Sequence, residues 1–153
     1  MPTYARIRWV GVGLFVSAVM AACGSQSPSS SSSSTTPTAS PSATPAVMAK
    51  TVGSEGRILV AGSNGMTVYN FSKDTPGVSN CKGACRTNWP ALTVPSGQTP
   101  TGGSGVTGQL ATITRDDGTV QVTYNGLPLY FFHNDKAPGD INGKYANWSL
   151  VKP

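Results

Sequence analysis

The sequence contains a single histidine, His133, among 153 residues. Hydrolase chemistry of the Ser-His type is therefore not expected, because one histidine leaves little choice of base and no serine lies in a G-x-S-x-G context. A metal centre built from clustered side chains is also not expected, so His133 is only a weak candidate ligand for copper or haem iron. We predict no catalytic residue, no resident cofactor and no enzymatic activity.

Basic side chains are few and scattered along the chain. The net charge is +5, and without residues 1–22 nine basic and six acidic side chains leave a net charge of +3. A nucleic-acid-binding face requires clustered Lys and Arg, and the sequence has no such run. We therefore predict no nucleic-acid partner.

The sequence also lacks an apolar run long enough to span a membrane as a helix. Arg6 and Arg8 precede the short apolar segment 10–20, which is followed by Ala21, Ala22 and Cys23. This order is typical of a secretory signal peptide, which we assign to residues 1–22. The segment 20–23 resembles the bacterial lipobox, in which the chain is cut before a cysteine that then carries acyl chains such as palmitate. Cys23 is thus the predicted lipidation site, and an ordinary cleaved signal is the alternative.

Residues 24–47 are almost entirely Ser, Thr, Pro and Ala, and they carry no charge. Such a segment cannot bury enough apolar surface to fold, so residues 23–47 are predicted to be a lipidated cysteine followed by a disordered tether. Fully extended, the tether reaches at most about 80 Å.

Three cysteines leave one unpaired in a secreted chain. With Cys23 assigned to the lipid, Cys81 and Cys85 are predicted to form a structural disulfide in an oxidising compartment. A redox-active dithiol or a copper site at this pair is the alternative.

Residues 48–153 are poor in Ala, Leu, Glu and Lys and show no sustained helical periodicity. Asp117-Gly118 and Asn125-Gly126 are strong signals for two-residue hairpin turns, because both turn residues need positive φ angles. These features predict an all-β domain with strands at 57–60, 66–71, 91–94, 110–114, 119–124, 129–132 and 148–151.

The domain carries one sequence pattern twice. The segment 64–74 recurs 61 residues later as 125–135, and both copies keep Asn-Gly, a Tyr, the aromatic residue two positions on and a closing Asp. Each copy continues to an Asn-Trp pair. This duplication predicts two β-repeats, at about 50–97 and 106–153, packed about a pseudo-twofold axis in one small monomeric domain. The repeated motif residues are Tyr69, Phe71 and Asp74, then Tyr130, Phe132 and Asp135.

Alternation along a strand places the motif aromatic residues on one face, which we predict to be core. The opposite face, formed by residues 68, 70 and 72 and by residues 129, 131 and 133, is predicted to point outward or into an interface. On that face Phe131 is a surplus aromatic residue that could mark an exposed patch for a partner or a glycan. The motif carboxylates, Asp74 and Asp135, are expected to cap turns. A cation site is the alternative.

This combination resembles a bacterial family of predicted lipoproteins with a tandem Tyr-x-aromatic-x-x-Asp motif, also described as a secreted repeat of unknown function. The resemblance includes segments 69–74, 81–85, 89–92, 122–135 and 138–143, together with Trp148. It implies an extracytoplasmic protein held at the bacterial cell membrane, and it brings no established activity.

We therefore expect a non-enzymatic binding or interaction module whose partner is an unknown envelope protein or glycan. The alternative is a redox or electron-transfer accessory that uses Cys81 and Cys85, or copper or haem bound near His133.

Overall fold

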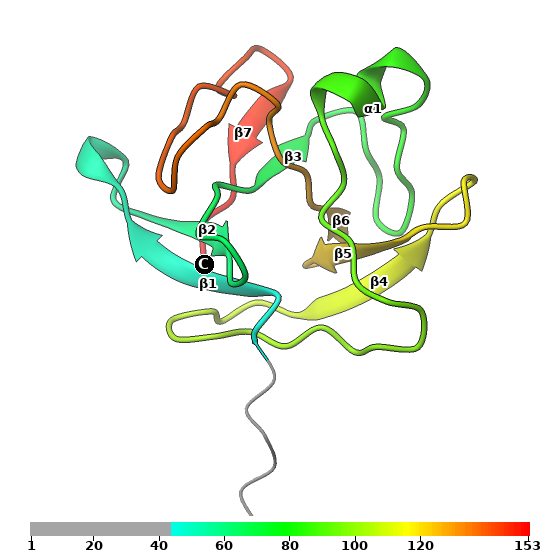
Figure 1. Ribbon diagram of the computed structural model, residues 1–153, viewed down its shortest axis with the longest axis horizontal. Helices are drawn as coiled ribbons and strands as arrows, with labels where there is room; N and C mark the ends of the chain where they lie inside the picture. Colours follow the sequence, from blue (N-terminus) through cyan, green and yellow to red (C-terminus); the bar gives the residue numbers. More distant parts are fainter. Residues whose placement is uncertain (1–43) are drawn as a thin grey trace, which may run out of the picture. The chain divides into compact units, whose positions relative to one another are not determined.

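The structure is a computed structural model that describes residues 44–153, and this part of the chain is all-β, as predicted, with very little helix (Figure 1). Strands β1 (Val47–Thr51) and β2 (Arg57–Ala61) form one antiparallel pair, joined by the 3-10 helix η1 (Gly53–Glu55). Strands β3 (Tyr69–Phe71) and β7 (Trp148–Leu150) form another. An antiparallel sheet contains β4 (Leu110–Thr114), β5 (Val120–Tyr124) and β6 (Leu127–Pro128).

The predicted signal peptide, Cys23 and most of the predicted tether lie outside the described residues. Within the described range, no helix combines the length and hydropathy that crossing a membrane requires. The folded part begins a few residues before the predicted boundary at residue 48. Val47 is fully buried and opens β1 opposite Ala61. One residue earlier, the Ala46 N–H donates to the Thr101 carbonyl at 2.8 Å.

The Asn125-Gly126 turn is confirmed. Asn125 and Gly126 adopt the positive φ angles, 49° and 83°, that this type of turn requires. At Asp117-Gly118, β4 and β5 form the predicted hairpin, but only Gly118 has a positive φ angle, 80°, so this is not the predicted two-residue turn. The segments 91–94 and 129–132 differ from the prediction, because they form isolated bridges such as Ala91 with Tyr130 rather than continuous strands. The helix α1 (Ala84–Asn88) was also not predicted, since five residues are too few to show a helical period.

The two repeats exchange backbone hydrogen bonds reciprocally. At the centre, the Tyr69 N–H donates to the Tyr130 carbonyl at 2.8 Å, and the Tyr130 N–H donates to the Tyr69 carbonyl at 3.0 Å. This mutual pair marks the pseudo-twofold axis that the duplication predicts.

Each hairpin also pairs with the closing segment of the other repeat. The Leu59 N–H donates to the Val151 carbonyl, and the Val122 N–H donates to the Leu92 carbonyl, both at 2.8 Å. Strand β3 of the first repeat is likewise paired with β7 of the second. Neither repeat therefore completes its own sheet.

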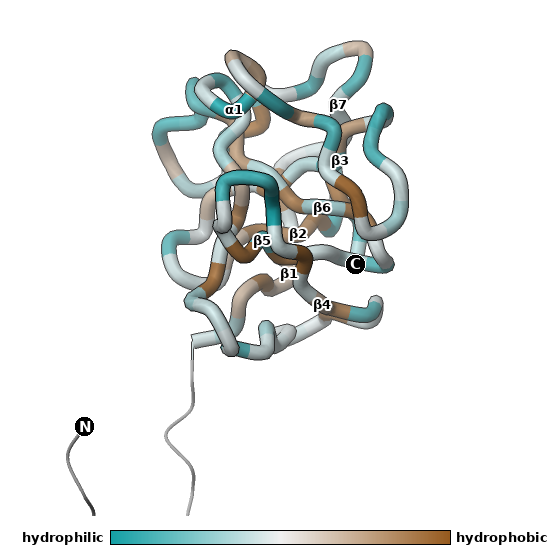
Figure 2. Tube along the Cα trace, turned by 90° about the vertical axis from the view of Figure 1, so that its right-hand side faces the viewer, coloured by the Kyte–Doolittle hydropathy of each residue, from teal (hydrophilic) through white to brown (hydrophobic). Residues whose placement is uncertain are grey.

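The core consists of two clusters on opposite faces of the central strands. The motif aromatic residues form one cluster with the paired tryptophans, and aliphatic side chains from both repeats form the other. Residues 68 and 129 were predicted to point outward or into an interface. The outward placement is wrong, because Val68 and Leu129 are fully buried in the aliphatic cluster, to which both repeats contribute. Phe131 packs against the same cluster and so does not form an exposed patch. Figure 2 shows the hydrophobic segments concentrated along the strands and the hydrophilic ones mostly in the loops.

We predict that neither repeat folds alone. Fragments 44–98 and 99–153 should each lack a cooperative thermal transition, because Leu59 and Val122 lose the segments that pair with them. A chain cut once at a protease site inserted among the exposed residues 96–98 should keep its transition. Circular dichroism melting of the cut chain, of each fragment and of their mixture tests this. A cooperative melt from either single fragment would contradict the prediction.

Candidate functional site

The motif tyrosines and aspartates pair across the repeats. The Tyr69 hydroxyl donates to Asp135 Oδ2 at 2.7 Å, and the Tyr130 hydroxyl donates to Asp74 Oδ2 at 2.6 Å. All four side chains are buried. The motif therefore encodes a reciprocal contact in which each repeat supplies the tyrosine for the other repeat's carboxylate.

The second oxygen of each carboxylate holds the turn that follows its own strand. Asp74 Oδ1 accepts the Asn80 N–H at 2.7 Å, and Asp135 Oδ1 accepts the Asn142 N–H at 2.9 Å. Each aspartate thus joins its local turn to the tyrosine of the other repeat.

Burial dominates the electrostatics of these pairs. It raises the pKa of Asp74 above its usual value, and the hydrogen bonds from Tyr130 and Asn80 and the charge of Arg115 offset this only in part. Burial, with the hydrogen bond to Asp74, raises the pKa of Tyr130 to about 12. Burial also raises the pKa of Tyr69 well above its usual value. The tyrosines therefore stay protonated and act as donors at physiological pH.

A buried hydrogen-bonded chain extends from this contact to the disulfide loop. Arg115, whose side chain is 3% exposed, donates to Ser79 Oγ at 2.9 Å, to the Cys81 carbonyl at 2.8 Å and to Gln121 Oε1. Ser79 Oγ lies 2.7 Å from the Tyr130 hydroxyl. These bonds satisfy most of the donors of the Arg115 guanidinium group.

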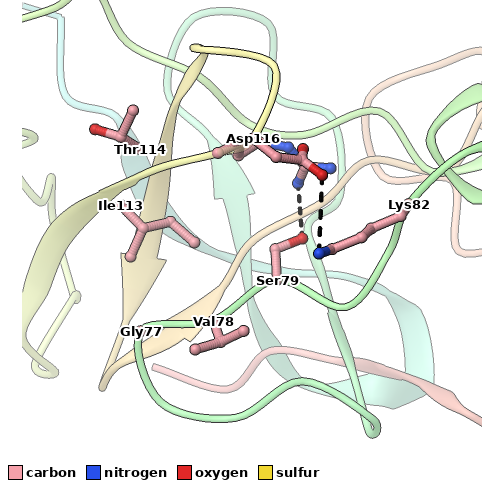
Figure 3. Close-up of a pocket in the computed structure, with 8 residues that line it drawn as sticks. Gly77, Val78, Ser79, Lys82, Ile113, Thr114 and Asp116 are labelled. Atoms are coloured by element: carbon pink, nitrogen blue, oxygen red, sulfur yellow. Dashed lines mark hydrogen bonds and ion pairs between the residues drawn. The ribbon is translucent and has the colours of Figure 1, made fainter.

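Ser79 and Arg115 also line a small cavity of about 260 Å³ (Figure 3). Figure 3 shows Lys82 directed at Asp116, with Lys82 Nζ 3.8 Å from Asp116 Oδ2, while Ser79 accepts its hydrogen bond from Arg115. Because the charged side chains around this cavity already have partners within the protein, it offers few unpaired polar groups to a ligand.

The disulfide joins Cys81 and Cys85, whose Cα atoms are 5.3 Å apart. Cys81 is fully buried and Cys85 is half-buried. The Cys85 carbonyl accepts the Trp89 N–H at 2.8 Å. The disulfide loop therefore helps to position Trp89, which follows α1.

A second and larger cavity, of about 470 Å³, lies beside the paired tryptophans. Four of its lining side chains are aromatic, namely Trp89, Phe132, Tyr145 and Trp148. Three are amides, Asn88, Asn134 and Asn147, and His133 and Ala146 complete the lining. We call this site the aromatic–amide pocket.

Both repeats build the aromatic–amide pocket. The rings of Trp89 and Trp148, which occupy equivalent positions in the two repeats, stack with centroids 3.7 Å apart and an interplanar angle of 5°. The His133 N–H donates to the Asn88 carbonyl at 3.0 Å, and at the equivalent position the Ser72 N–H donates to the Asn147 carbonyl at 2.9 Å. The pocket therefore exists only when the repeats are assembled.

His133 lies at the rim of this pocket, exposed and edge-on to Phe132 with the ring centroids 4.9 Å apart. In the part of the chain that the structure describes, no group of three or more His, Cys, Asp and Glu side chains is arranged to hold a metal ion.

The sequence did not identify Tyr145 as a site residue. This residue is 56% exposed. The one sequence feature that could have indicated this pocket was the repeated Asn-Trp pair, which places Asn88 and Asn147 in equivalent positions. Tyr145 lies outside the repeated segments, and Asn134 lies within the second one at a position that is Lys73 in the first.

Comparison with known proteins identifies one family. The family described as a secreted repeat of unknown function matches residues 51–93 and 111–152, which fall within the two predicted repeats. No curated protein and no solved structure matches the chain.

We predict that Tyr69→Phe and Tyr130→Phe each lower the free energy of unfolding by about 2 kcal/mol, because each leaves a buried carboxylate without one donor. The melting temperature should fall by about 8 °C. Tyr145→Phe, at an exposed position, is the matched control and should change stability by less than about 0.5 kcal/mol. Calorimetric melting of the three variants tests this, and a wild-type melting curve for Tyr130→Phe would contradict it.

We also predict a loss of stability in alkaline solution. The pKa of Tyr130 is about 12 in the folded chain, against a usual value of 10.0. Between these values the folded state retains a proton that the unfolded state releases, so the stabilising contribution is complete below pH 10 and is lost as the pH rises toward 12. The slope should be about 1.4 kcal/mol per pH unit for this tyrosine.

Denaturant unfolding of wild type, Tyr130→Phe and Tyr145→Phe at several values between pH 9 and 12 measures this slope. Tyr130→Phe should lower the slope by about 1.4 kcal/mol per pH unit, leaving the contribution of Tyr69, and Tyr145→Phe should not lower it. Equal slopes in all three proteins would refute the assignment.

Proposed function

The chain belongs to the family of secreted repeats of unknown function, and we propose that it is a non-catalytic binding module anchored at the bacterial cell membrane. The anchor is the acylated Cys23, as the lipobox-like segment indicates. The 20 residues between Cys23 and the described domain can span at most about 70 Å, which holds the domain within the envelope.

The aromatic–amide pocket is the observation that carries the binding proposal. It is the larger of the two cavities described above, and its volume falls in the range of ligand-binding pockets. Tyr145 lies at the rim of the pocket and is exposed, so its ring is not needed to fill the hydrophobic core. An exposed aromatic side chain beside several amides is a surface suited to recognition.

The distribution of acidic groups supports a binding role over a catalytic one. The motif carboxylates Asp74 and Asp135 are buried and bonded to tyrosines and turn N–H groups, so they do not face the pocket. None of the nine side chains lining the pocket is a carboxylate, a thiol or an ammonium group.

The redox alternative stays a prediction and has less support. Thiol exchange requires access to a sulfur atom, and of the two cysteines only Cys85 is partly exposed. Copper or haem near His133 would have one histidine and three amides around it, which is a poor donor set for either metal.

We also propose that the domain is monomeric and has no nucleic-acid partner. The position related by the pseudo-twofold axis is already occupied by the second repeat of the same chain, so a second copy is not needed to complete the fold.

A Cys23→Ser chain separates anchoring from binding. Without the lipid it should leave the membrane fraction, yet it should still sediment with washed envelope fragments. Adding Tyr145→Ala should reduce that sedimentation at least fivefold. Adding Val78→Ala, at the other large hydrophobic residue that is exposed among residues 44–153, should not. Quantitative blotting of pellet and supernatant measures both effects. If the Cys23→Ser chain remains in the supernatant, the envelope-binding role is wrong.

A further inference from the structure

We infer that the aromatic–amide pocket binds a neutral saccharide of the envelope, about one or two pyranose units at a time. The sugar would stack on the Tyr145 ring and form hydrogen bonds to the surrounding amides. This inference rests on the proposed binding function and names the ligand class of the same pocket.

The charge of the lining indicates a neutral ligand. The pocket contains no Asp, Glu, Lys or Arg. Lys136 and Lys144 do not line the pocket, and both already have partners. Lys136 Nζ donates to the carbonyl of His133 at the pocket rim at 2.6 Å, and Lys144 Nζ pairs with Glu55 at 2.7 Å. An anionic phosphate or a charged peptide end would lose hydration here without gaining an ion partner in the lining itself.

The aromatic side chains indicate a ligand with one apolar face. The rings of Trp89 and Trp148 stack on each other, so those faces are covered. Tyr145 is different, because it meets Trp89 at 88° and Phe132 at 66°, and among residues 44–153 no ring stacks on its faces. These edge contacts orient the ring while more than half of the side chain stays exposed. The C–H face of a pyranose is an apolar surface of matching shape and size.

The amides indicate a ligand rich in hydroxyl groups. An Asn side chain presents a donor and an acceptor in one plane, which matches a hydroxyl group that both donates and accepts. Within the described residues the side chains of Asn88 and Asn134 form no hydrogen bonds. Asn147 Oδ1 has only a long contact of 3.4 Å with Ser72 Oγ.

The backbone around these amides is nevertheless held in place. The carbonyl groups of Asn88 and Asn147 accept hydrogen bonds from the His133 and Ser72 N–H groups. A ligand would therefore order a few side chains and no backbone, which keeps the entropic cost of binding low. The volume of about 470 Å³ is sufficient for one or two sugar rings.

Calorimetric titration of the full chain tests the ligand class, in a detergent without a sugar headgroup. The neutral probes are the linear tetramers of N-acetylglucosamine, glucose and mannose, and the tetramer of galacturonic acid is the charged control. We expect at least one neutral probe to bind and the charged probe not to bind. Tyr145→Ala should weaken binding at least tenfold and Asn134→Ala several-fold.

One control separates the pocket from the rest of the surface. Val78→Ala, which lies outside the pocket, should bind as wild type does. Tyr145 and Val78 are both exposed, so loss of folding is not expected to interfere.

The outcomes distinguish this inference from the proposed function. If no neutral probe binds while sedimentation with envelope fragments still depends on Tyr145, the ligand class is wrong and the binding function stands. If a probe binds equally well to wild type, Tyr145→Ala and Asn134→Ala, the assignment to this pocket is overturned. If neither probes nor envelope fragments bind, both proposals fail.

Discussion

The reciprocal contact between the two repeats is the constraint on which the rest of the domain depends. At its centre Tyr69 and Tyr130 exchange backbone hydrogen bonds, and their hydroxyl groups donate to the aspartates of the opposite repeats. Because a buried carboxylate is costly unless it is hydrogen-bonded, these pairs favour one register of the repeats over any shifted one. The motif that repeats in the sequence therefore serves to hold the two repeats together in one register.

This assembly explains where a binding surface can form. The same symmetry that pairs the tyrosines brings the two Asn-Trp segments together, so that Trp89 and Trp148 stack at the centre of the aromatic cluster. The stacked rings are buried, and both tryptophans line the pocket. The rest of the lining includes Tyr145 and His133, which differ between the repeats and which in the proposed binding role would set specificity.

A buried polar network that joins the two repeats, and a disulfide in the first repeat, add to this scheme. Arg115 links Ser79 and the Cys81 carbonyl, and the Ser79 hydroxyl meets Tyr130. The loop of Cys81 and Cys85 thereby connects the reciprocal contact to α1 and to the Asn88 side of the pocket. A short loop closed by a disulfide is well suited to this role, because it restrains the chain where the helix alone is too short to be stable.

The sequence by itself determined the all-β class, the two repeats, the Asn125-Gly126 turn and the disulfide. These follow from alternation along strands, from the repeated pattern, from the turn residues and from the number of cysteines, all of which can be seen without knowing the fold. Only the tertiary structure decided which repeat supplies the partner of each tyrosine. It also decided that Val68 and Leu129 are buried, since alternation separates two strand faces but does not say whether one or both are covered. The exposure of Tyr145 was likewise decided by packing, because the pocket is formed by segments far apart in the chain.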